Sequence, residues 1–224
     1  MSKLLIKEEQ QVAIALARNT LETALGLVDE KSLLSPSPFE GEGGGDVFNF
    51  NNKPLSFSPL RKGREMSHDK NPMVYKKFTI FAEKRGVFVT LHQNGELHGC
   101  IGLIEPIKPL GEAIKEMALA AAFDDYRFSP ITTKEWPKIK IEISVLTVPE
   151  KINNIQQIQL GKHGVIIKSG LHSGVFLPQV ATETGWSLEE FMDELCSQKA
   201  GLPKDCWRHG RSEIYIFEAQ VFSE

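Results

Sequence analysis

The fold is decided by the stretch GVFVTLHQNGELHGCIGLI, which occupies residues 86–104. Residues 87–92 and 97–104 are rich in the β-branched, aromatic and aliphatic residues that are typical of strands. Between them lies Asn94-Gly95, the dipeptide that most favours a two-residue turn in a tight hairpin. We therefore predict an antiparallel β-hairpin at this place in the chain.

The hairpin sets the side-chain directions around a candidate functional residue, Cys100. Pairing across a two-residue turn would place Leu91 opposite His98 and Val89 opposite Cys100. His98 and Cys100 would then share one face of the sheet. A three-residue turn would reverse this parity, because successive side chains of a strand point to opposite faces.

The rest of the chain mixes helices and strands without a strict alternation of the two. We read the fold as α+β, with a mainly antiparallel sheet flanked by helices. Apolar periodicity, capping residues and glycine or proline stops give the expected elements: helices at 7–28, after Pro109 and from Ser187 to Gly201; a short helical turn after a capping box of Thr132 and Glu135; and strands at 139–145, 165–168, 175–177 and 214–222.

Residues 36–67 interrupt this pattern. They are rich in Pro, Gly, Ser and Asn, and the piece SPSPF at 35–39 is echoed by SFSPL at 56–60. The segment resembles a genomic palindromic repeat element translated in frame. Such a composition cannot bury a core, so we expect a disordered or surface insertion, with a lid as the alternative. We expect residues 1–35 and 68–224 to form a single α+β domain.

Composition and charge exclude several classes of protein. The chain has 224 residues, of which 41% are hydrophobic and 25% charged, and its formal net charge is −3. Bulk electrostatics therefore argue against a strongly basic nucleic-acid-binding protein. Charges interrupt the N-terminus before a signal peptide could form, and no apolar run reaches the ~20 residues of a membrane span. We expect a cytoplasmic protein that does not contact membranes.

The three cysteines do not suggest a metal or a disulfide framework. Cys100, Cys196 and Cys206 are odd in number and widely spaced, without a CxxC pair. This pattern argues against a disulfide scaffold, a zinc ribbon and an iron–sulfur site. Cys196 lies near an apolar helix stripe, which predicts a buried, inert thiol. The histidines form no HExxH pair, and no phosphate or dinucleotide loop is present, so neither a metal nor a cofactor is expected.

Cys100 is the best candidate for chemistry. Gly99 and Gly102 would leave space beside it, and a nucleophilic role needs a nearby base or cation. His98 could be the base and Arg127 the cation, which makes these three the candidate catalytic residues. The alternative is that Cys100 is a small core residue. Asp125, with Arg127, could bind a polar ligand, or the two could form an internal salt bridge at a helix end.

Several segments, taken in order, resemble the AMMECR family, whose prokaryotic members are called AmmeMemoRadiSam system protein A. The chain departs from the family pattern at His98, where Arg is usual, and at Tyr126, where the family tends to have Pro. The segments that carry the resemblance are GVFVTL at 86–91, GELHGCIG at 95–102, AAF at 121–123, RFSP at 127–130, IEISVL at 141–146, LPQV at 177–180 and KAGL at 199–202.

The resemblance implies an α+β fold in two unequal lobes, with the Gly-Cys-Ile-Gly signature functionally central. Within the matched motifs, the candidate ligand-binding residues are Gly99, Gly102, Asp125 and Gln179. The composite family name implies partnership with a Memo-like protein, related in fold to extradiol dioxygenases, and with a radical S-adenosylmethionine enzyme. No biochemical activity is implied. Two hypotheses stay open: an accessory or substrate-binding protein, and an enzyme that uses Cys100 as a nucleophile to modify a small molecule or protein.

Overall fold

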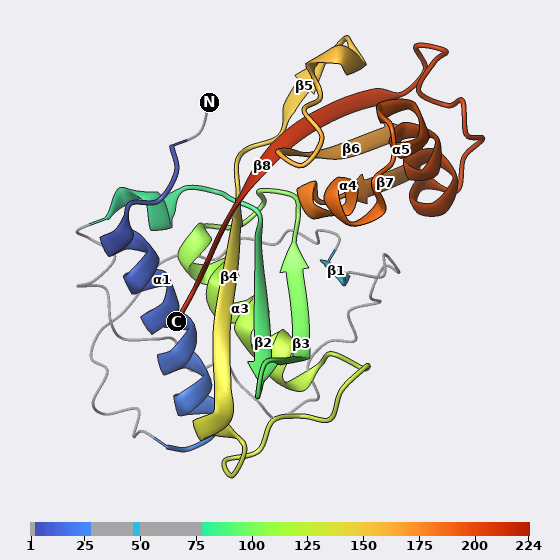
Figure 1. The fold of residues 1–224 in the computed structure, drawn as a ribbon. Coiled ribbons are helices and arrows are strands. Elements are labelled where there is room, and N and C mark those ends of the chain that lie inside the picture. Colours follow the sequence, from blue (N-terminus) through green and yellow to red (C-terminus); the bar gives the residue numbers. More distant parts are fainter. Residues whose placement is uncertain (1–2, 28–46, 50–77) are drawn as a thin grey trace. The chain divides into compact units, whose positions relative to one another are not determined.

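The structure is a computed structural model that describes residues 3–27, 47–49 and 78–224. The chain divides into two compact units of unequal size (Figure 1). The larger contains Leu4–Val145 and Val221–Glu224, and the smaller is built mainly of Leu146–Gln220. The α+β fold class is confirmed, and the two units match the two unequal lobes that the family resemblance implies.

The larger unit is built on the predicted hairpin. Strands β2 (Val87–Gln93) and β3 (Glu96–Leu103) are joined by Asn94 and Gly95, whose φ angles of 53° and 87° suit a two-residue hairpin turn. Strand β4 (Ile139–Leu146) pairs with β2, and β1 (Val47–Asn49) pairs with β3, all antiparallel. The order β1-β3-β2-β4 places Cys100 on an inner strand beside the short strand β1.

The register of the hairpin differs from the prediction at its decisive point. His92 pairs with Leu97 as expected, but a β-bulge follows, so that Thr90 rather than Val89 pairs with Cys100. The predicted pairs Leu91–His98 and Val89–Cys100 are wrong, because the bulge leaves one extra residue on β3. Cys100 therefore lies on the face of Thr90, opposite the face that packs into the main core.

Helices α1 (Lys7–Ala24) and α3 (Leu110–Phe123) cover the core face of this sheet (Figure 1). Both present small or aliphatic residues at helical spacing, and these are fully buried. Helix α1 ends before the predicted residue 28, which lies outside the described residues. The buried stripes are Ala13, Ala17 and Leu21 of α1, and Leu110, Ile114, Met117 and Ala121 of α3.

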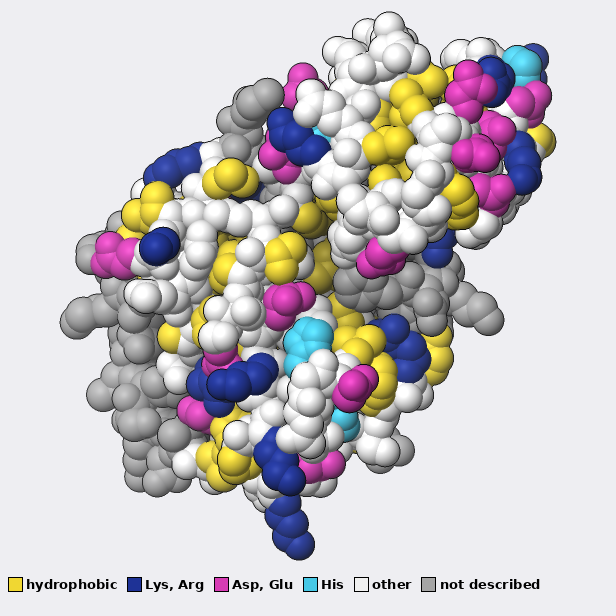
Figure 2. Space-filling view, in the orientation of Figure 1, with side chains coloured by type: hydrophobic (Ala, Val, Ile, Leu, Met, Phe, Trp, Pro, Cys, Tyr) yellow, Lys and Arg dark blue, Asp and Glu magenta, His cyan; other side chains and the backbone are white. Residues whose placement is uncertain are grey.

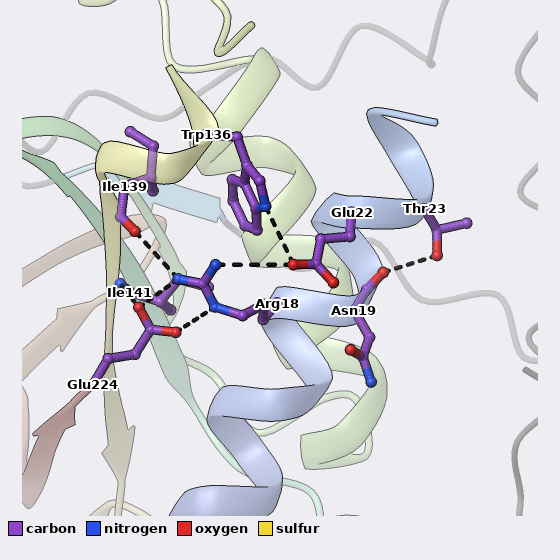
Figure 3. A network of polar contacts seen from close by, with 8 residues as sticks. All are labelled: Arg18, Asn19, Glu22, Thr23, Trp136, Ile139, Ile141 and Glu224. Carbon is purple, nitrogen blue, oxygen red and sulfur yellow. Dashed lines mark hydrogen bonds and ion pairs between the residues drawn. The ribbon is translucent and has the colours of Figure 1, made fainter. Parts of the chain in front are cut away.

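A polar network fixes α1 to the sheet (Figure 3). The guanidinium of Arg18 binds the carboxylate of Glu224 and donates to the Ile139 carbonyl oxygen at 3.2 Å. It also lies over the Trp136 ring, whose indole N–H donates to Glu22 at 3.2 Å. Trp136 begins the short helix η3 (Trp136–Lys138), which follows the capping contacts of Thr132 and Glu135 that the sequence predicts. A second short helix, η2 (Thr79–Ala82), precedes the hairpin.

The smaller unit has its own antiparallel sheet and core. Strand β8 (Glu213–Ser223) pairs with β5 (Glu150–Ile152) and with β6 (His163–Ser169), and β6 pairs with β7 (His172–Phe176). Its helices are η4 (Ile155–Gln157), α4 (Pro178–Thr184), α5 (Leu188–Glu194) and the π-helix η5 (Leu195–Ala200). The predicted Ser187 cap with Glu190 and the stop at Gly201, whose φ is 64°, are confirmed.

The expectation for Cys196 needs correction. Cys196 is buried as predicted, but it is no free thiol, because it forms a disulfide with Cys206 across a Cα–Cα distance of 6.1 Å. The turn that follows Gly201 brings the two together, which sequence spacing did not indicate. Within the expected disordered or surface insertion, residues 47–49 form β1, and residues 36–46 and 50–67 lie outside the described residues, so that expectation stays a prediction.

Candidate functional site

The backbone of Cys100 is held by two charged side chains from another part of the chain. The Cys100 N–H donates to Asp125 Oδ2 at 2.9 Å, and Arg127 Nη2 donates to the Cys100 carbonyl oxygen at 3.0 Å. Strand β1 pairs with β3 only from Ile101 onward. Asp125 and Arg127 thus serve as partners for backbone groups that would otherwise need another strand or water.

Asp125 and Arg127 also bind one another. Asp125 Oδ1 accepts from Arg127 Nε at 2.9 Å and from the Arg127 backbone N–H at 3.2 Å, while Nη2 lies 2.7 Å from Oδ2. Burial alone would raise the pKa of Asp125, but these hydrogen bonds and the one from Cys100 hold it below its ordinary value. The hydrogen bond to Asp125 raises the pKa of Arg127. The salt bridge between Asp125 and Arg127, one of the two alternatives considered from the sequence, is therefore present.

The Cys100 thiol is sealed from solvent. Its residue is 0% exposed, and Sγ lies 3.1 Å from Thr90 Oγ1. Burial raises the pKa of the thiol to about 12, although the Thr90 hydroxyl and the Arg127 charge act in the opposite direction. Roughly one thiol in 10⁵ would be ionised near neutral pH. Because the thiolate is the nucleophile, the activated thiol expected from the sequence is not what this geometry favours.

His98 makes contacts of a different kind. Its ring centroid lies 5.9 Å from that of Phe128, and the Phe128 ring in turn lies 5.3 Å from the Arg127 guanidinium carbon. Its Nε2 is buried without a hydrogen-bond partner. The imidazole therefore packs on the segment that holds Cys100.

The two glycines of the signature are needed for close packing. A Cβ on Gly99 would lie 2.1 Å from the carbonyl oxygen of Ala121 in α3, and one on Gly102 would lie 2.1 Å from the Phe88 ring. Both distances are far below van der Waals contact. The two glycines therefore have no free space at their own Cβ positions, because Ala121 of α3 and Phe88 fill it.

Six of the seven residues predicted from the sequence as catalytic or ligand-binding lie in the larger unit, and the seventh is Gln179. The structure adds Thr90 beside Cys100, which was missed because the strand pairing was predicted without the bulge. Gln179 belongs to α4 of the smaller unit and is half-buried; its backbone carbonyl oxygen accepts from Thr182 Oγ1 at 2.7 Å.

Across residues 3–27, 47–49 and 78–224, no cluster of three or more His, Cys, Asp or Glu side chains could hold a metal ion. No helix in these ranges is long and apolar enough to span a membrane.

Comparison with known proteins gives consistent matches. A sequence model of the AMMECR1 family matches residues 58–222. A Methanopyrus kandleri protein, MK0488, is 51% identical over 152 residues, 64% of this chain and 73% of that protein. A Pyrococcus furiosus protein, PF1979, is 42% identical over 177 residues, 74% of this chain and 80% of the other. The crystal structure of the uncharacterized protein PH0010 from Pyrococcus horikoshii has a TM-score of 0.62 and 33% identity, and the match covers 95% of this chain and 90% of that one.

Proposed function

This chain belongs to the AMMECR1 family, and from that premise we propose that it is an accessory or substrate-binding protein that acts with a Memo-like protein and a radical S-adenosylmethionine enzyme. The observation that carries the non-catalytic part of the proposal is the state of Cys100. Cys100, the cysteine outside the disulfide, is buried, and its thiol has a pKa of about 12. The neighbouring cation, Arg127, forms an ion pair with Asp125.

The same contacts give the protein a rigid surface. Asp125 and Arg127 anchor the segment 124–130 to β3, while Tyr126 between them is 62% exposed. The contact of His98 with Phe128 brings the start of β3 beside this segment, and there Leu97 is 39% exposed. A large exposed aromatic on a fixed backbone is a typical anchor for a binding partner, because little side-chain entropy is lost on binding. We assign the binding role to this surface, formed by Leu97, His98, Tyr126 and Phe128.

Partner binding tests the proposal directly. The full chain would be titrated calorimetrically with the Memo-like protein and with the radical S-adenosylmethionine enzyme encoded by the same organism. We expect Tyr126→Ala to weaken association at least tenfold, the effect of a central aromatic anchor. The matched control is Tyr215→Ala, which changes a half-buried tyrosine of the smaller unit. Absence of binding by the unmodified chain to either protein, or an equal loss in both variants, would contradict the proposal.

The alternative is an enzyme that uses Cys100 as its nucleophile. The Thr90 hydroxyl within 3.1 Å of Sγ and the nearby Arg127 are the features that favour it, since both lower the thiol pKa. Alkylation by iodoacetamide across pH 6–10 separates the two functions. The accessory role predicts slow alkylation of the native protein that rises steadily up to pH 10. A plateau below about pH 8.5, the ordinary range of a free thiol, would favour the nucleophile.

A further inference from the structure

The smaller unit holds a lysine in an unusual setting. Lys199 lies in the π-helix η5, is half-buried, and places its Nζ 5.7 Å from the ring centroid of Phe176. Phe176 is itself packed against Trp186 and Phe191, with centroids 5.9 and 5.1 Å away. The ammonium group thus rests at the edge of an aromatic cluster, where water is partly excluded.

Nothing in the described part of the chain neutralises this charge. Lys199 has no ion pair there, and burial lowers the pKa of its ammonium group. Figure 2 shows acidic and basic side chains mixed over α5 and the segment after it, and two of the acidic ones form ion pairs there, Glu194 with Lys204 and Glu189 with Arg208. Each acidic side chain of α5 has a partner other than Lys199: Glu189 has Arg208, Glu190 has Ser187, Asp193 has Trp207 and Glu194 has Lys204.

The backbone that carries Lys199 is fixed at both ends of the π-helix. The Cys196–Cys206 disulfide holds its first turn, and the ring nitrogen Nδ1 of His172 lies 3.1 Å from the Ala200 carbonyl oxygen. Strand β7 approaches so closely that a Cβ on Gly174 would lie 2.7 Å from the Ala200 backbone nitrogen. A π-helical turn is rare and is frequently found at functional sites.

We propose that Lys199 is a binding point for an oxyanion, the phosphate or carboxylate of a small ligand, on the smaller unit. A partly desolvated ammonium group without a counter-charge carries an uncompensated cost, which a bound anion removes. The ring face of Phe176 occupies one side of the ammonium and leaves its N–H donors to point elsewhere. Lysine serves as a compact point charge for phosphate and carboxylate groups. This assignment is independent of the surface around Tyr126.

Protection from acylation tests the assignment in the full chain. A limiting amount of an acetylating reagent is applied in inorganic phosphate, in acetate and in potassium chloride of equal ionic strength, and each lysine is located by mass spectrometry. Phosphate or acetate at ten times its dissociation constant should slow acetylation of Lys199 about tenfold. Lys204, which is exposed and paired with Glu194, is the internal control and should change little. Protection by phosphate alone would identify a phosphate site, and protection by acetate as well would identify a site that also accepts carboxylates. Equal protection by chloride, or no protection by any of the three salts, would overturn the proposal.

A variant gives a readout that does not depend on amine reactivity. Lys199→Met keeps an apolar stem of similar length and removes the charged nitrogen. In chloride it should melt at the same temperature as the unmodified chain or higher, because an uncompensated charge is lost. Phosphate should raise the melting temperature of the unmodified chain and of the control Lys204→Gln, but not that of Lys199→Met. An equal rise in all three proteins would show that phosphate acts elsewhere.

Discussion

Replacing Asp125 with asparagine tests whether the contacts around Cys100 hold the larger unit together. The carboxylate accepts four N–H groups, two from the Arg127 side chain and one each from the Cys100 and Arg127 backbones. Asparagine keeps the shape of the side chain but loses the charge, and it turns an NH₂ group toward at least one of these donors. The Asp125 side chain is 1% exposed and that of Arg127 15%, so water can replace few of the hydrogen bonds that the substitution removes.

The expected loss follows from these contacts. Removing one partner of a buried ion pair costs about 3–5 kcal/mol, and we expect about 3 kcal/mol here because Arg127 retains some access to water. For a chain of this size that corresponds to a fall of about 6–12 °C in melting temperature. The matched control is Asp124→Asn, an exposed neighbour whose change should stay within about 0.5 kcal/mol. Urea unfolding followed by circular dichroism measures both variants.

The pH dependence gives the same reasoning a second, independent readout. The pKa of Asp125 is lowered in the folded protein, so its contribution is present above the unfolded value of ~3.9 and is lost as the pH falls through the folded value. The difference between the unmodified chain and Asp125→Asn should be complete at pH 7 and shrink below about pH 4. A difference under 0.5 kcal/mol at pH 7, or one that does not change on acidification, would refute the structural role of this carboxylate.

Three further substitutions probe the packing of the two units. Gly99→Ala should cost about 3 kcal/mol, because its Cβ would meet the rigid Ala121 carbonyl oxygen; urea unfolding that shows a loss below 1 kcal/mol would contradict this. His98→Leu should leave the unfolding free energy equal or about 1 kcal/mol higher, since a buried nitrogen without a partner is removed; a clear loss would reveal a hydrogen bond to the imidazole. Cys206→Ser should destabilise the smaller unit by about 3 kcal/mol through loss of its bond to Cys196, and a reducing agent should reproduce the effect in thermal melts of the unmodified chain.

The fold could be predicted from local signals, because the elements that carry it are locally consistent. Asn94-Gly95 determines its own turn conformation, and the alternation of β4 and the capping box at Ser187 are properties of a few consecutive residues. The side-chain directions around Cys100 could not be predicted, because they depend on one extra residue in a bulge. An isolated glycine within a strand, such as Gly99, is a signal for a bulge, but packing against other elements decides the register on either side of it.

The disulfide illustrates the same limit for covalent structure. Cys196 and Cys206 are ten residues apart, and only the path of the chain after Gly201 decides whether their Cα atoms approach within bonding range. The apolar surroundings of Cys196 could be predicted, since Phe191, Met192 and Leu195 precede it at helical spacing and are buried. The change from α-helix to π-helix at Leu195 could not, although it determines where Lys199 lies.

Under the proposed accessory role, packing explains the Gly-Cys-Ile-Gly signature without chemistry at sulfur. Each residue that suggested catalysis has a structural role. Gly99 allows α3 to pack closely on the strand, Cys100 is buried beside Thr90, and Arg127 donates to the backbone of β3. What these roles have in common is that they fix the segment 124–130 on the sheet. Under the proposed binding role, the segment carries Tyr126 as an anchor in this chain, so Tyr126→Ala should impair partner binding while leaving the buried motif intact.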